Sequence, residues 1–340
     1  MKNQLGMVLL VTRQWGSNAG FNTELKQCLV EYCGADQVRH LELSNSENLI
    51  DSISNITREF EFKFLIIDSR SCIINAKMPA LFFHLQDART LNLICKERDI
   101  VPICIVTDPL MPGFALVGDL VTYRNGIVAP ITASIPFSKY LLRNSTEALG
   151  TPISIKTFFE VEKVMSGAPK LFDLFLGGSI YEPRKSYFEA VVEKLNGSGI
   201  KIQLHPKVSN NYYEYLQGLS SARMVLSTNF LQLPGSKKLH LLGKSLETLH
   251  IGSLLLTQST PDLTRNFVEY EDFVPVSNAA DASEKILFYH QNEKERIRIA
   301  GNGYSKAREL VSKKFFFSEI DRGLRDSNLP LMKLDKASVE

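Results

Sequence analysis

The chain has 340 residues, of which 44% are hydrophobic and 22% are charged. This length exceeds what one hydrophobic core usually serves and predicts two domains, and the apolar fraction excludes a disordered chain. With 39 Lys and Arg against 37 Asp and Glu, the formal net charge is +2, too balanced for a general nucleic-acid-binding protein.

The first half of the chain alternates apolar runs with helical periodicity. This alternation predicts a doubly wound parallel sheet, an α/β architecture. Around residues 150–170 the periodicity is lost, which predicts a domain boundary and a first domain of residues 1–160. The expected strands are residues 7–12, 38–43, 64–68, 102–107 and 127–131, and the expected helices are residues 21–32, 46–60 and 79–98.

The second half repeats the pattern and predicts a second Rossmann-like domain over residues 161–320. Three consecutive aromatic residues, Phe315 to Phe317, are expected to dock the last helix onto the core, and residues 321–340 form a polar tail or a segment that crosses back. Two such domains suggest a cleft with ligands beyond the carboxyl ends of the strands. The expected strands are 172–176, 200–204, 224–227 and 253–257, and the helices 184–195, 212–219, 241–251, 282–290 and 294–311.

A small-residue turn in the second half is a candidate phosphate site. Gly177, Gly178 and Ser179 follow a predicted strand, and Arg184 and Lys185 begin the helix after it. Backbone N–H groups and a helix N-terminus attract anions there. Two cations in a first helical turn are unfavourable by about 0.3–1 kcal/mol without an anionic partner. A plain turn with two solvated cations is the alternative.

The segment KSLETLHIGSLLLTQ, residues 244–258, predicts a short helix, a glycine stop at Gly252 and a buried strand. Lys244 and Glu247 lie three residues apart and therefore share one helical face. They are a candidate pair at the ligand edge of the sheet. An exposed ion pair contributing about 0.2–0.5 kcal/mol is the structural alternative.

These motifs together resemble the donor domain of GT-B glycosyltransferases of the "glycosyl transferases group 1" type. The resemblance is carried by FDLFLGGSIYEPRKSYFEAVV, by KSLETLHIGSLLLT and by EDFVPVSNAADASEKI followed by IAGNGYSKARE, and covers residues 172–318. It implies that Glu247 binds the donor ribose and that Lys244 lies near the phosphates. One departure concerns the E-x7-E pattern of retaining members, because Leu239 occupies its first position. The stereochemical outcome therefore stays open.

In the first half, Gly16, Asn18 and Gly20 occupy the loop after the first strand. The resemblance implies that this loop faces the cleft and the acceptor. A helix N-terminus capped by Asn18 or Asn22 is the alternative.

Candidate catalytic side chains end predicted strands at the ligand edge of the first domain. Asp108 is the preferred general base for deprotonating an acceptor hydroxyl, with Asp68 and His84 behind it. His205 ends a strand of the second domain and could approach the donor. Loop capping, or a structural histidine, is the alternative for each.

The sequence also carries negative indications. The five cysteines, an odd number without a C-x-x-C pair, argue against a disulfide framework, and no spacing typical of metal ligands occurs. The apolar run 5–11 is too short to span a membrane. We therefore expect a soluble, cytoplasmic protein with room for peripheral membrane contact, no cofactor and no metal.

The predicted function is transfer of a sugar from a nucleotide-diphosphate donor to a hydroxyl of a saccharide, lipid-linked or protein acceptor, in glycan or polysaccharide synthesis. A non-hydrolysing nucleotide-sugar epimerase shares the architecture and is one alternative. A degenerate, non-catalytic scaffold is another, to which Leu239 lends weight.

Overall fold

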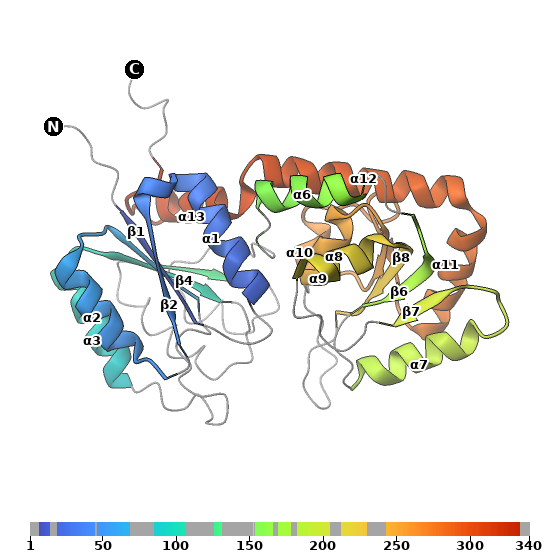
Figure 1. Ribbon diagram of the computed structural model, residues 1–340, viewed down its shortest axis with the longest axis horizontal. Coiled ribbons are helices and arrows are strands. Elements are labelled where there is room, and N and C mark those ends of the chain that lie inside the picture. Colours follow the sequence, from blue (N-terminus) through green and yellow to red (C-terminus); the bar gives the residue numbers. More distant parts are fainter. Residues whose placement is uncertain are drawn as a thin grey trace, which may run out of the picture. The chain divides into compact units, whose positions relative to one another are not determined.

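The computed structural model divides the chain into two compact units (Figure 1). Unit 1 comprises Met1–Ser154 and Lys314–Glu340, and unit 2 comprises Ile155–Lys313. The first unit therefore takes back the last segment of the chain, and the division falls after Ser154 where the sequence pattern placed it at residue 160. The structure describes residues 7–13, 19–44, 46–68, 85–106, 126–130, 152, 154–165, 169–177, 182–204, 212–229 and 243–333.

Unit 1 contains a five-stranded sheet in the order β2-β1-β3-β4-β5, and every pairing is parallel. The predicted α/β class and the strand–helix alternation are confirmed. The strands are β1 (Val8–Arg13), β2 (Val38–Leu43), β3 (Phe64–Asp68), β4 (Val101–Val106) and β5 (Ile127–Pro130), and the helices are α1 (Ala19–Cys33), η1 (Ala35–Gln37), α2 (Leu49–Glu59), α3 (Leu85–Glu97) and α13 (Phe315–Asp326).

Both faces of this sheet are covered, which explains why its strands are continuous apolar runs. Along β1, Leu9 and Val11 pack under α2 and α3, whereas Val8 and Leu10 pack under α1 and α13. Alternate side chains of a strand point to opposite faces, so each apolar run supplies both cores. At the start of α2, Asn48 caps the helix by accepting from two backbone N–H groups.

Unit 2 repeats the architecture with a parallel sheet in the order β10-β9-β8-β6-β7. Gly252, with φ of +69°, lies between α9 and β9, the turn that the sequence predicted. The strands are β6 (Phe172–Leu176), β7 (Ile202–Leu204), β8 (Ala222–Ser227), β9 (Leu254–Thr257) and β10 (Val274–Pro275), and the helices are α6 (Ile155–Met165), α7 (Arg184–Lys194), α8 (Tyr212–Ser220), α9 (Gly243–His250), α10 (Pro261–Thr264), α11 (Ala279–Gln291) and α12 (Glu293–Ser312).

Helix α6 is the main element that the sequence pattern did not predict. Its Phe158 is 2% exposed and stacks on Tyr304 of α12, with the ring centroids 5.4 Å apart. The hydroxyl of Tyr304 also donates to Glu162 at 2.7 Å. Contacts with a helix about 140 residues away therefore stabilise α6, and they leave no trace in local periodicity.

The end of the chain is a helix of unit 1 up to Asp326, so residues 321–326 are not a tail. Phe316 and Phe317 pack in the core beneath α1, which confirms the expected docking (Figure 1). Asp321 is 4% exposed and accepts from the hydroxyl of Tyr32 at 2.6 Å and the amide of Met332 at 2.8 Å. One polar residue of this segment is therefore a buried, hydrogen-bonded carboxylate and not a surface group.

Candidate functional site

A cluster of buried charged side chains lies at the carboxyl edge of the sheet of unit 2. Gly177 follows β6 and Thr228 follows β8, two neighbouring strands of this sheet. Helix α7 begins with Arg184, and Lys244 and Glu247 lie on α9. Ligands of open α/β sheets bind at this edge.

Each of the two cations of the cluster is held by a hydrogen bond to a residue that directly follows a strand. Arg184 is 2% exposed, and its Nε donates to the hydroxyl of Thr228 at 2.7 Å. Lys244 is 8% exposed, and its Nζ donates to the carbonyl of Gly177 at 2.8 Å. The strand ends thus fix the positions of both side chains, and neither is a solvated surface cation.

Glu247 is also buried, at 9% exposure, so the exposed ion pair considered for Lys244 and Glu247 is wrong. Burial lowers the pKa of Lys244, the charge of Arg184 lowers it further, and Glu247 opposes both. For Tyr215 of α8, burial raises the pKa, and so do the negative charge of Glu247 and a hydrogen bond to it. The cluster therefore contains two cations, one carboxylate and a tyrosine that holds the carboxylate.

A network of neutral polar groups adjoins this cluster. The backbone N–H of Asn229 donates to Gln258 Oε1, and its side-chain Nδ2 donates to the Gln258 backbone carbonyl, both at 2.8 Å. The hydroxyls of Ser227 and Ser245 lie 3.1 Å apart and link β8 to α9. Within the described part of the chain, Gln258 Nε2 and Thr257 Oγ1 are buried without a hydrogen-bond partner. Because buried polar atoms are normally hydrogen-bonded, these two atoms are candidate contacts for a ligand.

Sequence reasoning missed Thr228, Tyr215, Asn229 and Gln258. Thr228, Asn229 and Gln258 carried a usable signal, because polar residues directly after buried parallel strands collect at the ligand edge. Tyr215 carried none, since its place next to Glu247 depends on how α8 and α9 pack.

Among the remaining second-half candidates, the structure describes Lys185, and this side chain does not join the cluster. Lys185 is exposed, and its Nζ lies 3.8 Å from Glu189 one turn along α7. Successive helical residues are about 100° apart, so Lys185 points away when Arg184 points inward. Gly178, Ser179 and His205 lie outside the described residues, as does Leu239.

In unit 1, Asp68 is the last residue of β3 and is 1% exposed, at the carboxyl edge of that sheet. Gly20 was expected in a loop, and this expectation is wrong because Gly20 belongs to α1, which begins at Ala19. Asn22 does not cap this helix in the expected way, because its Nδ2 donates to the Arg13 carbonyl at 2.9 Å. Asp108, His84, Gly16 and Asn18 lie outside the described residues.

Comparison with known proteins finds a family match for part of the chain. Residues 176–314, which carry the buried cluster, match the family described as glycosyl transferase-like. The fold is that of GT-B proteins, and this match confirms the resemblance of residues 176–314 to glycosyltransferases of the group 1 type. No curated protein matches the chain in sequence.

Solved structures of low sequence identity share the fold over nearly the whole chain. The Anabaena protein HepE in complex with UDP and glucose has a TM-score of 0.60 at 10% identity, covering 92% of this chain and 99% of that one. Sucrose-phosphate synthase from Thermosynechococcus elongatus gives 0.59 at 9% identity, over 94% and 100%. A putative UDP-N-acetylglucosamine 2-epimerase from Listeria monocytogenes gives 0.51 at 10%, over 97% and 100%.

Two further properties concern the described residues alone. None of their helices combines the length and apolar composition needed to cross a bilayer. No three of their His, Cys, Asp or Glu side chains are grouped so that they could hold a metal ion.

Proposed function

We propose that this protein transfers a sugar from a nucleotide-diphosphate donor to a hydroxyl acceptor, and that unit 2 binds the donor. The observation that carries the proposal is the buried cluster of two cations and one carboxylate at the carboxyl edge of the sheet. Two buried cations at the ligand edge of a sheet attract an anion strongly, because the effective dielectric constant there is low. A diphosphate supplies such a partner, and the family match of the same residues supports it.

Each member of the cluster has a proposed role. Arg184 and Lys244 bind the diphosphate and stabilise the charge that develops on it as the sugar leaves. They hold fixed positions through Thr228 and Gly177, so they need little reorganisation during the reaction. Glu247 accepts hydrogen bonds from the two ribose hydroxyls, and Tyr215 orients it.

For the acceptor, we propose that unit 1 supplies the base that deprotonates the hydroxyl. Asp108 is the first candidate, with Asp68 and His84 next, and the buried position of Asp68 at a strand end supports that residue. The expected product belongs to glycan or polysaccharide synthesis in the cytoplasm, with a saccharide, lipid-linked or protein acceptor. A metal ion is not required in this scheme, since Arg184 and Lys244 neutralise the leaving group.

A thermal-shift screen against UDP-, GDP-, CMP- and dTDP-sugars tests donor binding, because a specific donor raises Tm by mass action. UDP-sugars come first, since HepE has been solved with UDP-glucose. With the donor found, Glu247→Gln should weaken its affinity by about tenfold or more, the loss of about 1.4 kcal/mol. Lys185→Gln, on the exposed face of α7, should leave it unchanged.

Turnover then separates the three functions that share this fold. Consumption of donor only when an acceptor is added supports transfer, and turnover of the donor alone supports the epimerase reading and overturns the transferase. Specific donor binding without turnover across a broad acceptor panel would support the non-catalytic scaffold. EDTA should not lower the transfer rate; a rate restored only by added metal contradicts the metal-free scheme.

A further inference from the structure

A second cavity in unit 2 lies at the amino-terminal edge of the same sheet. Its volume is about 490 Å³. The lining residues precede or begin strands, as with Lys170 before β6, Arg223 in β8 and Gly252 before β9, or lie on α12. The buried charge cluster follows the strands, so the cavity and the cluster occupy opposite edges of one sheet.

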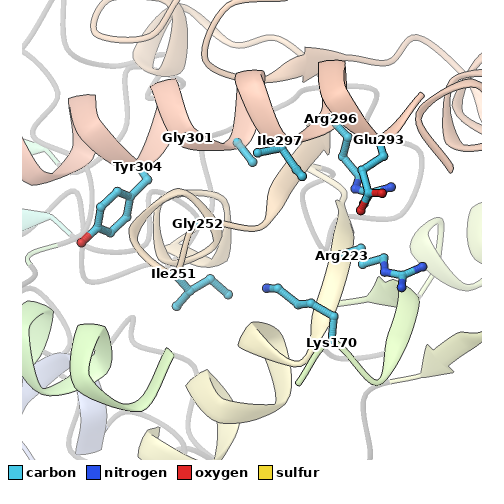
Figure 2. A pocket seen from close by; sticks show the side chains of 10 residues that line it. Lys170, Arg223, Ile251, Gly252, Glu293, Arg296, Ile297, Gly301 and Tyr304 are labelled. Carbon is cyan, nitrogen blue, oxygen red and sulfur yellow. The ribbon is translucent and has the colours of Figure 1, made fainter. Parts of the chain in front are cut away.

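Three cationic side chains, Lys170, Arg223 and Arg296, line this cavity (Figure 2). The ammonium of Lys170 donates to the carbonyls of Ser220 at 2.6 Å and Ala222 at 3.0 Å and to the hydroxyl of Ser253 at 3.3 Å, which uses its three N–H groups. Arg296 is 5% exposed and donates to the Tyr289 carbonyl at 3.1 Å. The third cation, Arg223, keeps 41% of its side chain exposed, so most of its donors can serve a ligand.

Two carboxylates offset only part of this charge. Glu293 lies 2.9 Å from Arg296, and Asp173 lies 2.8 Å from Arg223, while Lys170 has no carboxylate among its hydrogen-bond partners in the described structure. Three cations against two anions leave a positive cavity. In keeping with this, burial and then the charge of Arg296 lower the pKa of Lys170 to about 8.

The opposite wall of the cavity is apolar. Ile297 is 60% exposed, an unusual fraction for an isoleucine, and Ile251, Ala300 and the ring of Tyr304 extend the same surface. Gly301 adds no side chain, which leaves room between Tyr304 and Ile297 (Figure 2). A cationic end next to an apolar wall is the usual composition of a small-molecule site.

We propose that this cavity binds a small organic anion, a phosphate or carboxylate group on a flat apolar body. The anionic group would accept hydrogen bonds from Arg223 and be attracted by the charge of Lys170, and the body would lie against Ile297 and Tyr304. Guanidinium groups pair with both anions through two parallel hydrogen bonds. The volume favours an organic anion over inorganic phosphate, because an ion alone would leave the apolar wall in water.

Calorimetric titration of the full chain with phenyl phosphate and with benzoate tests this site. At least one of them should bind with Kd below about 1 mM, roughly 4 kcal/mol of binding free energy. Ile297→Glu puts a negative charge into the apolar wall, in the place of the ligand's apolar body, and should raise that Kd at least about tenfold. Asn302→Glu makes the same charge change on an exposed, non-lining position of α12 and should change it less than twofold.

Three further titrations test the binding mode and distinguish this site from the donor site. Arg223→Gln should weaken the binding of the anion. Phenol, which lacks the charge, should bind at least about tenfold more weakly than phenyl phosphate. Glu247→Gln should leave the titration unchanged, since it lies at the other sheet edge. Equal affinities for Ile297→Glu and the wild type, or inorganic phosphate binding as tightly as both organic probes, would overturn the proposal.

Discussion

At the scale of single residues, burial gives the Arg184, Lys244 and Glu247 cluster its chemical character. An exposed lysine–glutamate pair on a helix is screened by water and contributes little. Here the two residues are at most 9% exposed and share their surroundings with Arg184. Their charges act through a medium of lower effective dielectric constant, so their electrostatic interaction with a bound anion would be strong.

Tyr215 tests whether the orientation of Glu247 matters for binding. Tyr215→Phe removes the hydrogen bond to Glu247 and keeps the ring. It should lower the affinity for the nucleoside diphosphate by about 5–10-fold, on the order of 1 kcal/mol. Tyr304→Phe is the matched control, because it also removes a tyrosine–carboxylate hydrogen bond of unit 2, to Glu162. Calorimetry that shows the same loss for both variants would contradict the orienting role.

His250 predicts a pH dependence of stability. Its Nδ1 lies 2.6 Å from the Leu246 carbonyl, its ring packs edge-on to Phe158, and burial lowers its pKa to about 4. The unfolded chain, with an ordinary pKa near 6.5, binds the proton first as the pH falls. Stability should therefore decrease between about pH 6.5 and pH 4, by at most about 1.4 kcal/mol per unit from this group.

Urea unfolding of the wild type and of His250→Phe across this range measures the effect. The variant keeps an aromatic ring but cannot titrate, so its free energy of unfolding should fall less steeply as the pH drops from 6.5. Parallel pH profiles for the two proteins would show that His250 is protonated equally in the folded and unfolded states.

At the scale of elements, close packing of helix α12 explains why position 303, the last of the IAGNG segment, is a glycine. A Cβ built on Gly303 would lie 2.3 Å from the Asp272 carbonyl oxygen and 2.8 Å from Leu249 Cδ2. Helix α12 therefore approaches α9 and the turn before β10 too closely for any side chain. Because Leu249 lies on α9, this approach also supports the helix that carries Lys244 and Glu247.

Gly303→Ala should destabilise the protein by about 1–3 kcal/mol, the usual cost of overpacking. Gly301→Ala, two residues earlier, meets nothing within 4 Å and should be neutral or stabilising by up to about 1 kcal/mol. Chemical denaturation measures both. Two equally stable variants would contradict the close approach.

At the scale of the whole molecule, the return of α13 ties the end of the chain to unit 1. Phe317 is 1% exposed in the core beneath α1, so Phe317→Ala should destabilise unit 1 by about 3–5 kcal/mol. The proposed donor site belongs to unit 2, so nucleotide affinity should survive in the folded variant. Thermal unfolding and calorimetry check the two expectations, and a variant that retains stability but loses nucleotide affinity would contradict this division.

Much of this architecture could be predicted from the sequence, because buried parallel strands such as FLIID and FDLFL are unbroken apolar runs. The meeting of Arg184, Lys244 and Glu247 was also predictable, since the helices that carry them come after neighbouring parallel strands and therefore begin at one edge of the sheet. Helix α6 was not, because distant contacts stabilise it. Lys185 shared every sequence signal of Arg184, and only the helical rotation between neighbours separates them.

The central claim is that unit 2 binds a nucleoside diphosphate through its buried cations. Calorimetric titration of the wild type with UDP, GDP, CDP and dTDP, each beside its nucleoside, tests it most directly. The account predicts at least one diphosphate that binds at least about tenfold more tightly than its nucleoside, a difference of about 1.4 kcal/mol from the phosphates. No binding by any diphosphate, or equal binding of each diphosphate and its nucleoside, would contradict it.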